Sequence, residues 1–281
     1  MALPPLELGW FTLCIRTGSF AATRAFYEAL GFRLTGGQPE QGWAAMASGT
    51  TELTLMSFLQ ANLINLRGGN VIDLAEALSD RGCDPFHSPG FDPTSTERQA
   101  GPRRFDPDQW PSEFSLDRQG RPITQPGAGD FLIADPDGKL LYFDSVPLER
   151  VRFEAGERFA GEHVDGSVAA DQPDLGRLVL RLSVSDLEAS REFYERLGLE
   201  ERRRDRKSRY IELGNALDVP FVIGLCSEPD ETDAMTFECD DLDRLVTRLE
   251  ERGLQVGREP ARPIARLEDP EGNPILFVQR A

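Results

Sequence analysis

The chain has 281 residues, enough for two domains of ordinary size, each with its own core. Its 48 acidic and 31 basic residues give a net charge of −17, which repels phosphate backbones and argues against a nucleic-acid partner. No apolar run approaches the length of a membrane span and the N-terminus lacks signal-peptide features, so we expect a cytoplasmic protein with no membrane partner.

The first half of the chain alternates strand signals with helix signals. One helix is predicted between Ser19, as N-cap, and Gly31, and a second carries Val71 and Leu78 on one face and ends at Gly82. Strand-like runs lie at residues 8–15, 43–47, 52–58, 63–66 and 140–143.

The second half repeats this order. Its first helix is predicted to begin in a capping box, with Ser185 as the N-cap and Glu188 reaching back, and to end at Gly198. Its second helix carries Leu245 on its apolar face and ends at Gly253. Strand-like runs lie at residues 178–184, 209–213, 221–225, 235–238 and 275–278.

Three short sequences occur in both halves, in the same order. They are Phe-Tyr-Glu-x-Leu-Gly at 26–31 and 193–198, Leu-x-x-Arg-Gly at 78–82 and 249–253, and Asp-Pro-x-Gly at 135–138 and 269–272. Such a repeat indicates two homologous domains. Asp-Pro-x-Gly predicts a tight turn, because proline fixes φ and glycine accepts a positive φ.

The spacing of these sequences predicts the domain boundaries. Gly82 and Asp135 are 53 residues apart, whereas Gly253 and Asp269 are 16 apart, so the first half carries 37 extra residues. We place this insertion near 85–130. We expect a first domain at 1–148, a polar linker at 149–174 and a second domain at 175–281.

Three segments carry a family resemblance: SDLEASREFYERLGLE at 185–200, FECDDLDRLVTRLEERG at 237–253 and DPEGNPILFVQ at 269–279. They resemble the vicinal-oxygen-chelate superfamily, which includes glyoxalase I, bleomycin-resistance proteins and extradiol dioxygenases. The resemblance implies an α+β fold of two tandem glyoxalase-like domains. Each would consist of paired βαβββ modules whose curved sheets form a cup around a ligand. It also implies a monomer, because each domain serves as the other's partner.

Enzymes of this superfamily hold a divalent metal at three positions in a domain. The resemblance places these positions at Thr12, Leu63 and Tyr142 in the first domain, and at Val179, Ala234 and Leu276 in the second. None offers the imidazole, carboxylate or thiolate that such metals need. The only histidines are His87, at the insertion's edge, and His163, in the linker. We therefore predict no metal and no cofactor. His87 could be an acid or base at the cup mouth, or simply an exposed loop residue.

Strand alternation places several aromatic and polar side chains inside the first cup, as in small-molecule pockets. These are Trp10, Thr12, Cys14, Leu63, Asn65, Arg67, Tyr142 and Asp144. The insertion contains Phe105, Trp110 and Phe114, and irregular insertions are often lids. The predicted ligand contacts are Trp10, Thr12, Asn65, Trp110, Tyr142 and Asp144. The corresponding residues of the second domain, Val179, Arg181, Ala234 and Leu276, are expected to pack as core.

The leading functional hypothesis is metal-independent binding of a small aromatic or amphipathic molecule, of the sequestration or resistance type. One alternative is a superfamily enzyme, a lyase, isomerase or dioxygenase, with a non-standard active site. Another is a non-catalytic scaffold or regulatory protein in which side chains fill both cups. Fold alone does not decide among them.

Overall fold

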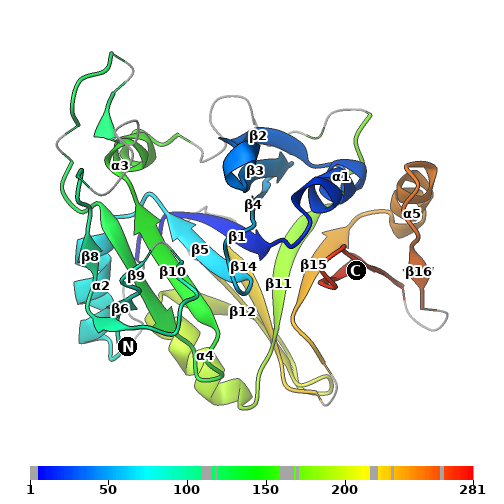
Figure 1. Cartoon of the computed structure of the whole chain (residues 1–281). Helices are drawn as coiled ribbons and strands as arrows, with labels where there is room; N and C mark the ends of the chain where they lie inside the picture. The colour runs from blue at the N-terminus through cyan, green and yellow to red at the C-terminus, as the bar shows by residue number, and fades with distance from the viewer. Residues whose placement is uncertain are drawn as a thin grey trace.

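The computed structural model describes residues 6–90, 92–108, 115–117, 119–123, 125–157, 168, 171–215, 221–228, 231–259 and 263–280. Within these ranges the chain folds into two mixed sheets and five α-helices, which confirms the predicted α+β class (Figure 1). No helix of the described part is long and apolar enough to cross a membrane.

The first sheet has the strand order β2-β3-β4-β1-β5-β10-β9-β6-β7, with β8 also paired to β9. Its strands are β1 (Trp10–Arg16), β2 (Arg33–Gln38), β3 (Trp43–Ser48), β4 (Thr51–Met56), β5 (Leu63–Arg67), β6 (Phe86–His87), β7 (Gln99–Ala100), β8 (Arg103–Arg104), β9 (Gly129–Ala134) and β10 (Leu140–Ser145). The helices of this half are α1 (Phe20–Leu30), α2 (Val71–Asp80), α3 (Pro147–Glu154) and the short 3₁₀-helix η1 (Pro39–Gln41).

The second sheet repeats this plan, in the order β12-β13-β14-β11-β15-β18-β17-β16. Its strands are β11 (Arg177–Ser183), β12 (Leu199–Asp205), β13 (Tyr210–Asn215), β14 (Val222–Cys226), β15 (Ala234–Cys239), β16 (Gly257–Arg258), β17 (Ile264–Glu268) and β18 (Pro274–Gln279). Its helices are α4 (Leu187–Arg196) and α5 (Leu242–Glu251).

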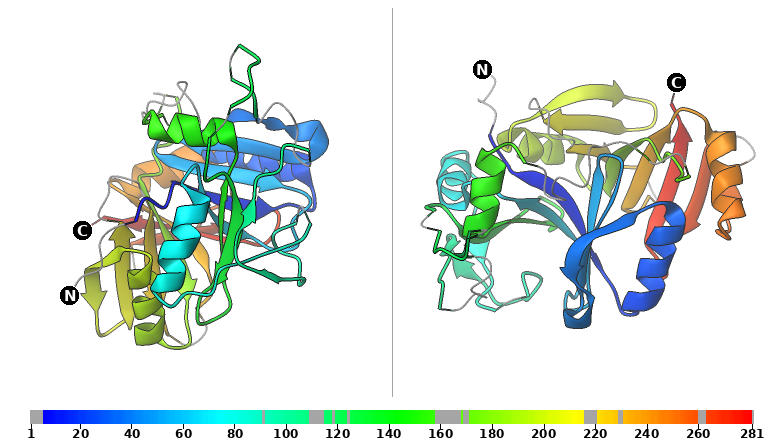
Figure 2. Two further views of the ribbon diagram at one scale, coloured as in Figure 1. Left: turned by 90° about the vertical axis from the view of Figure 1, so that its left-hand side faces the viewer. Right: turned by 90° about the horizontal axis from the view of Figure 1, so that it is seen from above.

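Each sheet joins two βαβββ modules through the strands that begin them. β1 pairs antiparallel with β5, and β11 pairs antiparallel with β15. These four strands lie in the middle of the molecule, with α2 and α5 at its opposite ends (Figures 1 and 2). Strands β7 and β8 belong to the insertion, and they extend the first sheet beside β6 and β9.

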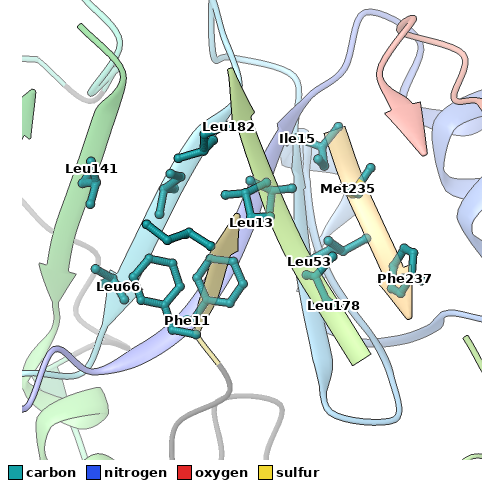
Figure 3. Packing of buried hydrophobic residues seen from close by; sticks show 14 of the residues in the cluster. Phe11, Leu13, Ile15, Leu53, Leu66, Leu141, Leu178, Leu182, Met235 and Phe237 are labelled. Carbon is teal, nitrogen blue, oxygen red and sulfur yellow. The ribbon is translucent and has the colours of Figure 1, made fainter. Parts of the chain in front are cut away.

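Alternation along each strand gives each sheet two different faces. Phe11, Leu13 and Ile15 of β1 are buried with helix side chains and with residues of the second sheet in one continuous hydrophobic cluster (Figure 3). We call this side the packed face. Trp10 and Thr12 alternate with them and therefore point to the other side, which we call the cup face.

The repeated sequences meet at the contact between the domains, in reciprocal pairs. The buried Tyr27 hydroxyl of α1 donates to Asp269 of the second domain's turn at 2.9 Å. The buried Tyr194 hydroxyl of α4 donates to Asp135 of the first domain's turn at 3.1 Å. The turn glycines Gly138 and Gly272 have φ of 80° and 84°, as predicted.

The Leu-x-x-Arg-Gly sequences belong to the same contact. Arg81 after α2 donates to the carbonyl of Arg196 at 2.9 Å, at the end of α4. Arg252 after α5 donates to the carbonyl of Ala29 at 2.7 Å, near the end of α1. Each arginine thus hydrogen-bonds a C-terminal carbonyl of the other domain's first helix, where a positive charge is favourable.

One predicted helix start differs from the structure, and another is confirmed in position but is capped differently. The N-cap of α4 is Asp186 rather than Ser185, because the Asp186 carboxylate accepts the N–H groups of Glu188 and Ala189. Ser19 is the N-cap residue of α1, but its side chain makes no capping bond. The carboxylate of Glu271, from the other domain, accepts the N–H groups before α1 instead, and one sequence cannot reveal so distant a partner.

Candidate functional site

The floor of the first cup is a row of three side chains on neighbouring strands. Thr12 of β1 lies opposite Asn65 of β5, and Asn65 lies beside Tyr142 of β10. Thr12 and Asn65 are fully buried, and Tyr142 is half-buried. The structure therefore brings together three of the predicted ligand contacts, and Asp144 follows two residues beyond Tyr142 on the same face.

A hydrogen-bonded network joins these residues. The Asn65 amide donates to Asp144 Oδ1 at 2.7 Å and to the Tyr142 carbonyl at 3.1 Å. The Arg67 guanidinium lies 3.1 Å from Asp144 and 2.8 Å from Glu149 of α3. The Cys14 thiol donates to Asn65 Oδ1 at 3.7 Å. Most of these buried polar groups thus have partners within the chain, as buried polar groups require.

Burial changes the proton affinities of this network. It raises the pKa of the Asp144 carboxyl to about 7, against the opposing effect of Arg67. Burial also raises the pKa of the Cys14 thiol to about 12, so this thiol stays protonated and unreactive. A carboxyl that changes charge near neutral pH inside a cup is a candidate functional group.

Helix α3 covers one end of the cup face. The Trp10 indole N–H donates to the Glu157 carbonyl at 2.8 Å, and its ring meets the Phe153 ring edge-on, with centroids 5.2 Å apart. Gly68 has φ of +81°, and a Cβ there would lie 2.7 Å from the Trp10 ring, so only glycine fits. The sequence analysis did not predict α3. Trp110 lies outside the described residues.

The far side of this cup carries groups from the insertion. Arg103 of β8 pairs with the buried Asp130 of β9 at 2.7 Å.

The Tyr142 hydroxyl has no hydrogen-bond partner in the described part of the chain, so it is available to a ligand. His87 bonds the Gly101 carbonyl and the Gln99 amide, so both ring nitrogens serve the β6–β7 contact.

The second cup face is more polar than the sequence analysis expected. Arg177 lies 3.0 Å from Glu212 and 2.5 Å from Glu238, and Arg181 pairs with Glu231 at 2.8 Å. The unexpected carboxylate is that of Glu212 on β13. Glu212 is buried and points to the cup face, whereas its neighbours Ile211 and Leu213 point to the packed face. This face is therefore a network of ion pairs and not plain core.

Three buried atoms of this second face have no partner among the described residues. They are Glu212 Oε2, Thr236 Oγ1 and Arg181 Nε. Leaving such an atom without a hydrogen bond costs roughly 1–3 kcal/mol. A ligand or water that hydrogen-bonds to one of these atoms removes that cost. Thr236 lies directly beside Val179 on the neighbouring strand.

Strand register shows which residues form rows across the two cup faces. Val179, Thr236 and Leu276 form one row in the second domain, equivalent to Thr12, Asn65 and Tyr142 in the first. The predicted middle positions, Leu63 and Ala234, lie two residues before Asn65 and Thr236 on the same strands, so alternation places them on the same face.

Neither row fits a divalent metal. The second domain offers one hydroxyl between two aliphatic side chains. The nearest carboxylate of the first domain, Asp144, is engaged by Arg67 and Asn65. Among the described residues, no three His, Cys, Asp or Glu side chains are grouped so as to hold a metal ion.

Comparison with known proteins agrees with this architecture. Residues 175–277 match the model of the Glyoxalase/Bleomycin resistance protein/Dioxygenase superfamily. This match covers the second domain. No curated protein matched the sequence.

Solved structures extend the likeness to the whole chain. An extradiol ring-cleaving dioxygenase from B. fuscum superposes with a TM-score of 0.57 at 14% identity, covering 99% of this chain and 73% of that one. Homoprotocatechuate 2,3-dioxygenase from Arthrobacter globiformis gives 0.55 at 14%, covering 99% and 81%. BphC, a halotolerant catechol dioxygenase, gives 0.55 at 16%, covering 97% and 86%. At these identities the likeness shows the tandem fold, and the fold resemblance predicted from the sequence is confirmed.

Proposed function

We propose that this protein binds a small molecule in a sheet cup without the help of a metal ion. The observation that carries the proposal is the buried Asn65–Asp144–Arg67 network, which lies on the same face as the Tyr142 hydroxyl. A cup with apolar walls and a few convergent polar groups is the usual form of a small-molecule site. Because the superfamily's metal positions do not fit a metal, the polar contacts must come from these side chains.

We place the ligand in the first cup, as the sequence analysis predicted. Trp10 and Tyr142 would supply aromatic surface, and Asp144 would supply a hydrogen-bonding group. Thr12 and Asn65 would form the floor. The ligand class is a small aromatic or amphipathic molecule, since the network leaves few polar atoms unpaired.

The second cup is the competing location for the same function. Its unpaired atoms on Glu212, Thr236 and Arg181 would suit a ligand with hydrogen-bond donors and acceptors. The two locations predict that different substitutions weaken binding, so one set of variants shows which cup holds the ligand.

The test is titration with 2-naphthol, followed by calorimetry and by NMR of the tryptophan indole N–H groups. The chain has three tryptophans, Trp10, Trp43 and Trp110, all in the first half. Binding in the first cup should shift the Trp10 signal. Tyr142→Leu and Asp144→Asn should weaken binding about tenfold, equivalent to about 1.4 kcal/mol.

The matched controls are the equivalent changes in the second domain. Leu276→Ala, Glu212→Gln and Thr236→Val should leave affinity within about twofold. Weakening confined to these controls would move the ligand to the second cup and overturn the first-cup site. Binding unaffected by any variant in either cup would overturn the proposed function for this probe.

A further inference from the structure

The packed faces of the two domains are not in contact along their whole length. At one end of β1, the Phe11 ring packs against Phe221 of the second domain, with ring centroids 4.7 Å apart. At the other end, around Ile15, a cavity of about 310 Å³ remains between the domains. Packed-face residues of both domains line it, and Leu63 and Ala234, the first residues of β5 and β15, also reach it.

The walls of this cavity are aliphatic and come from both domains. Leu13 and Ile15 of β1 line it from the first domain, and Leu180 and Leu182 of β11 with Met235 of β15 line it from the second. Figure 3 shows Ile15 beside Met235. All five are at most 5% exposed. The volume corresponds to about ten waters at roughly 30 Å³ each, but a stable buried water needs two to four polar partners, which such walls do not supply.

The rim of the cavity is polar and is formed by two equivalent contacts. Lys139, just before β10, pairs with Asp233, just before β15, at 2.8 Å. At the equivalent positions, Asn273 precedes β18 and Asn62 precedes β5, and the Asn62 amide donates to Asn273 at 2.6 Å. One side of the rim is therefore an ion pair and the other is neutral.

This asymmetry indicates which kind of molecule fits. An apolar body matches the walls, and a neutral hydroxyl or carbonyl can exchange hydrogen bonds with the two amides. An anion is disfavoured by the net charge of −17. A cavity of this volume is at the lower end of the range for small-molecule sites, and such sites favour domain interfaces.

We propose that this cavity between the domains is a second binding site, for a small neutral amphipathic molecule with an aliphatic body and a polar head. The aliphatic body lies among Leu13, Ile15, Leu182 and Met235. The head lies at the Asn62–Asn273 side of the rim. Because both domains line the site, its occupant binds only the docked arrangement and stabilises it.

The test uses 1-octanol as the probe and NMR of protein labelled at the methionine methyl carbons. Met235 lines the cavity, whereas Met46 and Met56 lie in the first domain outside it. Octanol should shift the Met235 methyl signal saturably, leave those of Met46 and Met56 in place, and raise Tm. No shift of Met235, or equal shifts of all three, would overturn the proposal.

A matched pair of variants at one position then tests the cavity itself. Leu182→Phe fills it and should weaken octanol binding at least tenfold, whereas Leu182→Met, similar in volume to leucine, should bind within about twofold of the wild type. If Leu182→Phe does not fold, Leu13→Phe fills the cavity from the other domain. Tight binding to a folded filled variant would overturn the proposal. Asp144→Asn should bind octanol normally, so a failure here is distinct from a failure of the first-cup function.

Discussion

The two buried tyrosine–aspartate contacts should make unequal contributions to stability. Tyr27→Phe removes the donor to Asp269, but this aspartate keeps a bond from the Asn273 amide at 2.7 Å. Tyr194→Phe removes the only side-chain donor to Asp135 in the described part of the chain. Hydrogen bonds to charged groups contribute about 1.5–3 kcal/mol. We expect about 1.5 kcal/mol for Tyr27→Phe and about 3 kcal/mol for Tyr194→Phe.

Urea unfolding followed by circular dichroism measures both losses. The contacts share no partners, so the double variant should lose about the sum of the two. Tyr210→Phe is the matched control, because its hydroxyl has no hydrogen bond among the described residues, and its effect should stay within about 0.5 kcal/mol. Losses below 0.5 kcal/mol for both variants, or a larger loss for Tyr27→Phe, would refute the reasoning.

Three further predictions concern the assembly, the metal and the pH response. Light scattering should find a monomer, and an obligate dimer would contradict the pairing of the two domains within one chain. Elemental analysis should find no stoichiometric Zn, Fe, Ni or Mn, and a chelator should leave 2-naphthol binding unchanged; metal retained after His87 and His163 are replaced would contradict our metal positions. The pKa of Asp144 is raised on folding, so its contribution to stability is largest below about pH 4 and is lost as pH rises towards 7. Asp144→Asn should flatten that decline in urea unfolding between pH 4 and 8, and an unchanged slope would show that another group titrates.

The fold was predictable because its signals are local and occur twice. Apolar spacing and glycine stops identify the helices of both halves, and alternation placed Thr12, Asn65 and Asp144 on one face, where the structure has them. Helix α3 was missed because its apolar side chains are few and its docking depends on Arg67, 82 residues before Glu149. Contacts at that separation leave no pattern within a single sequence.

The polar character of the second cup could have been predicted from one signal. Tyr210 and Glu212 alternate with Ile211 and Leu213 in β13, which indicates a strand with one polar face. The second-domain positions that were expected to pack as core, Val179, Arg181, Ala234 and Leu276, are mostly apolar and do not include Glu212. The pairing of Arg177 with two carboxylates on different strands required the structure.

The repeated and the unrepeated residues of this chain serve different purposes. The repeated tyrosines, arginines and Asp-Pro-x-Gly turns join the domains in reciprocal contacts, and each contact needs both copies to persist. The cup faces have no such constraint, because each cup lies within one domain. Their rows accordingly differ, with Thr12, Asn65 and Tyr142 in one and Val179, Thr236 and Leu276 in the other. Function in a duplicated chain is therefore best sought where the two halves disagree, which here means the cups and the unequal rim of the cavity between the domains.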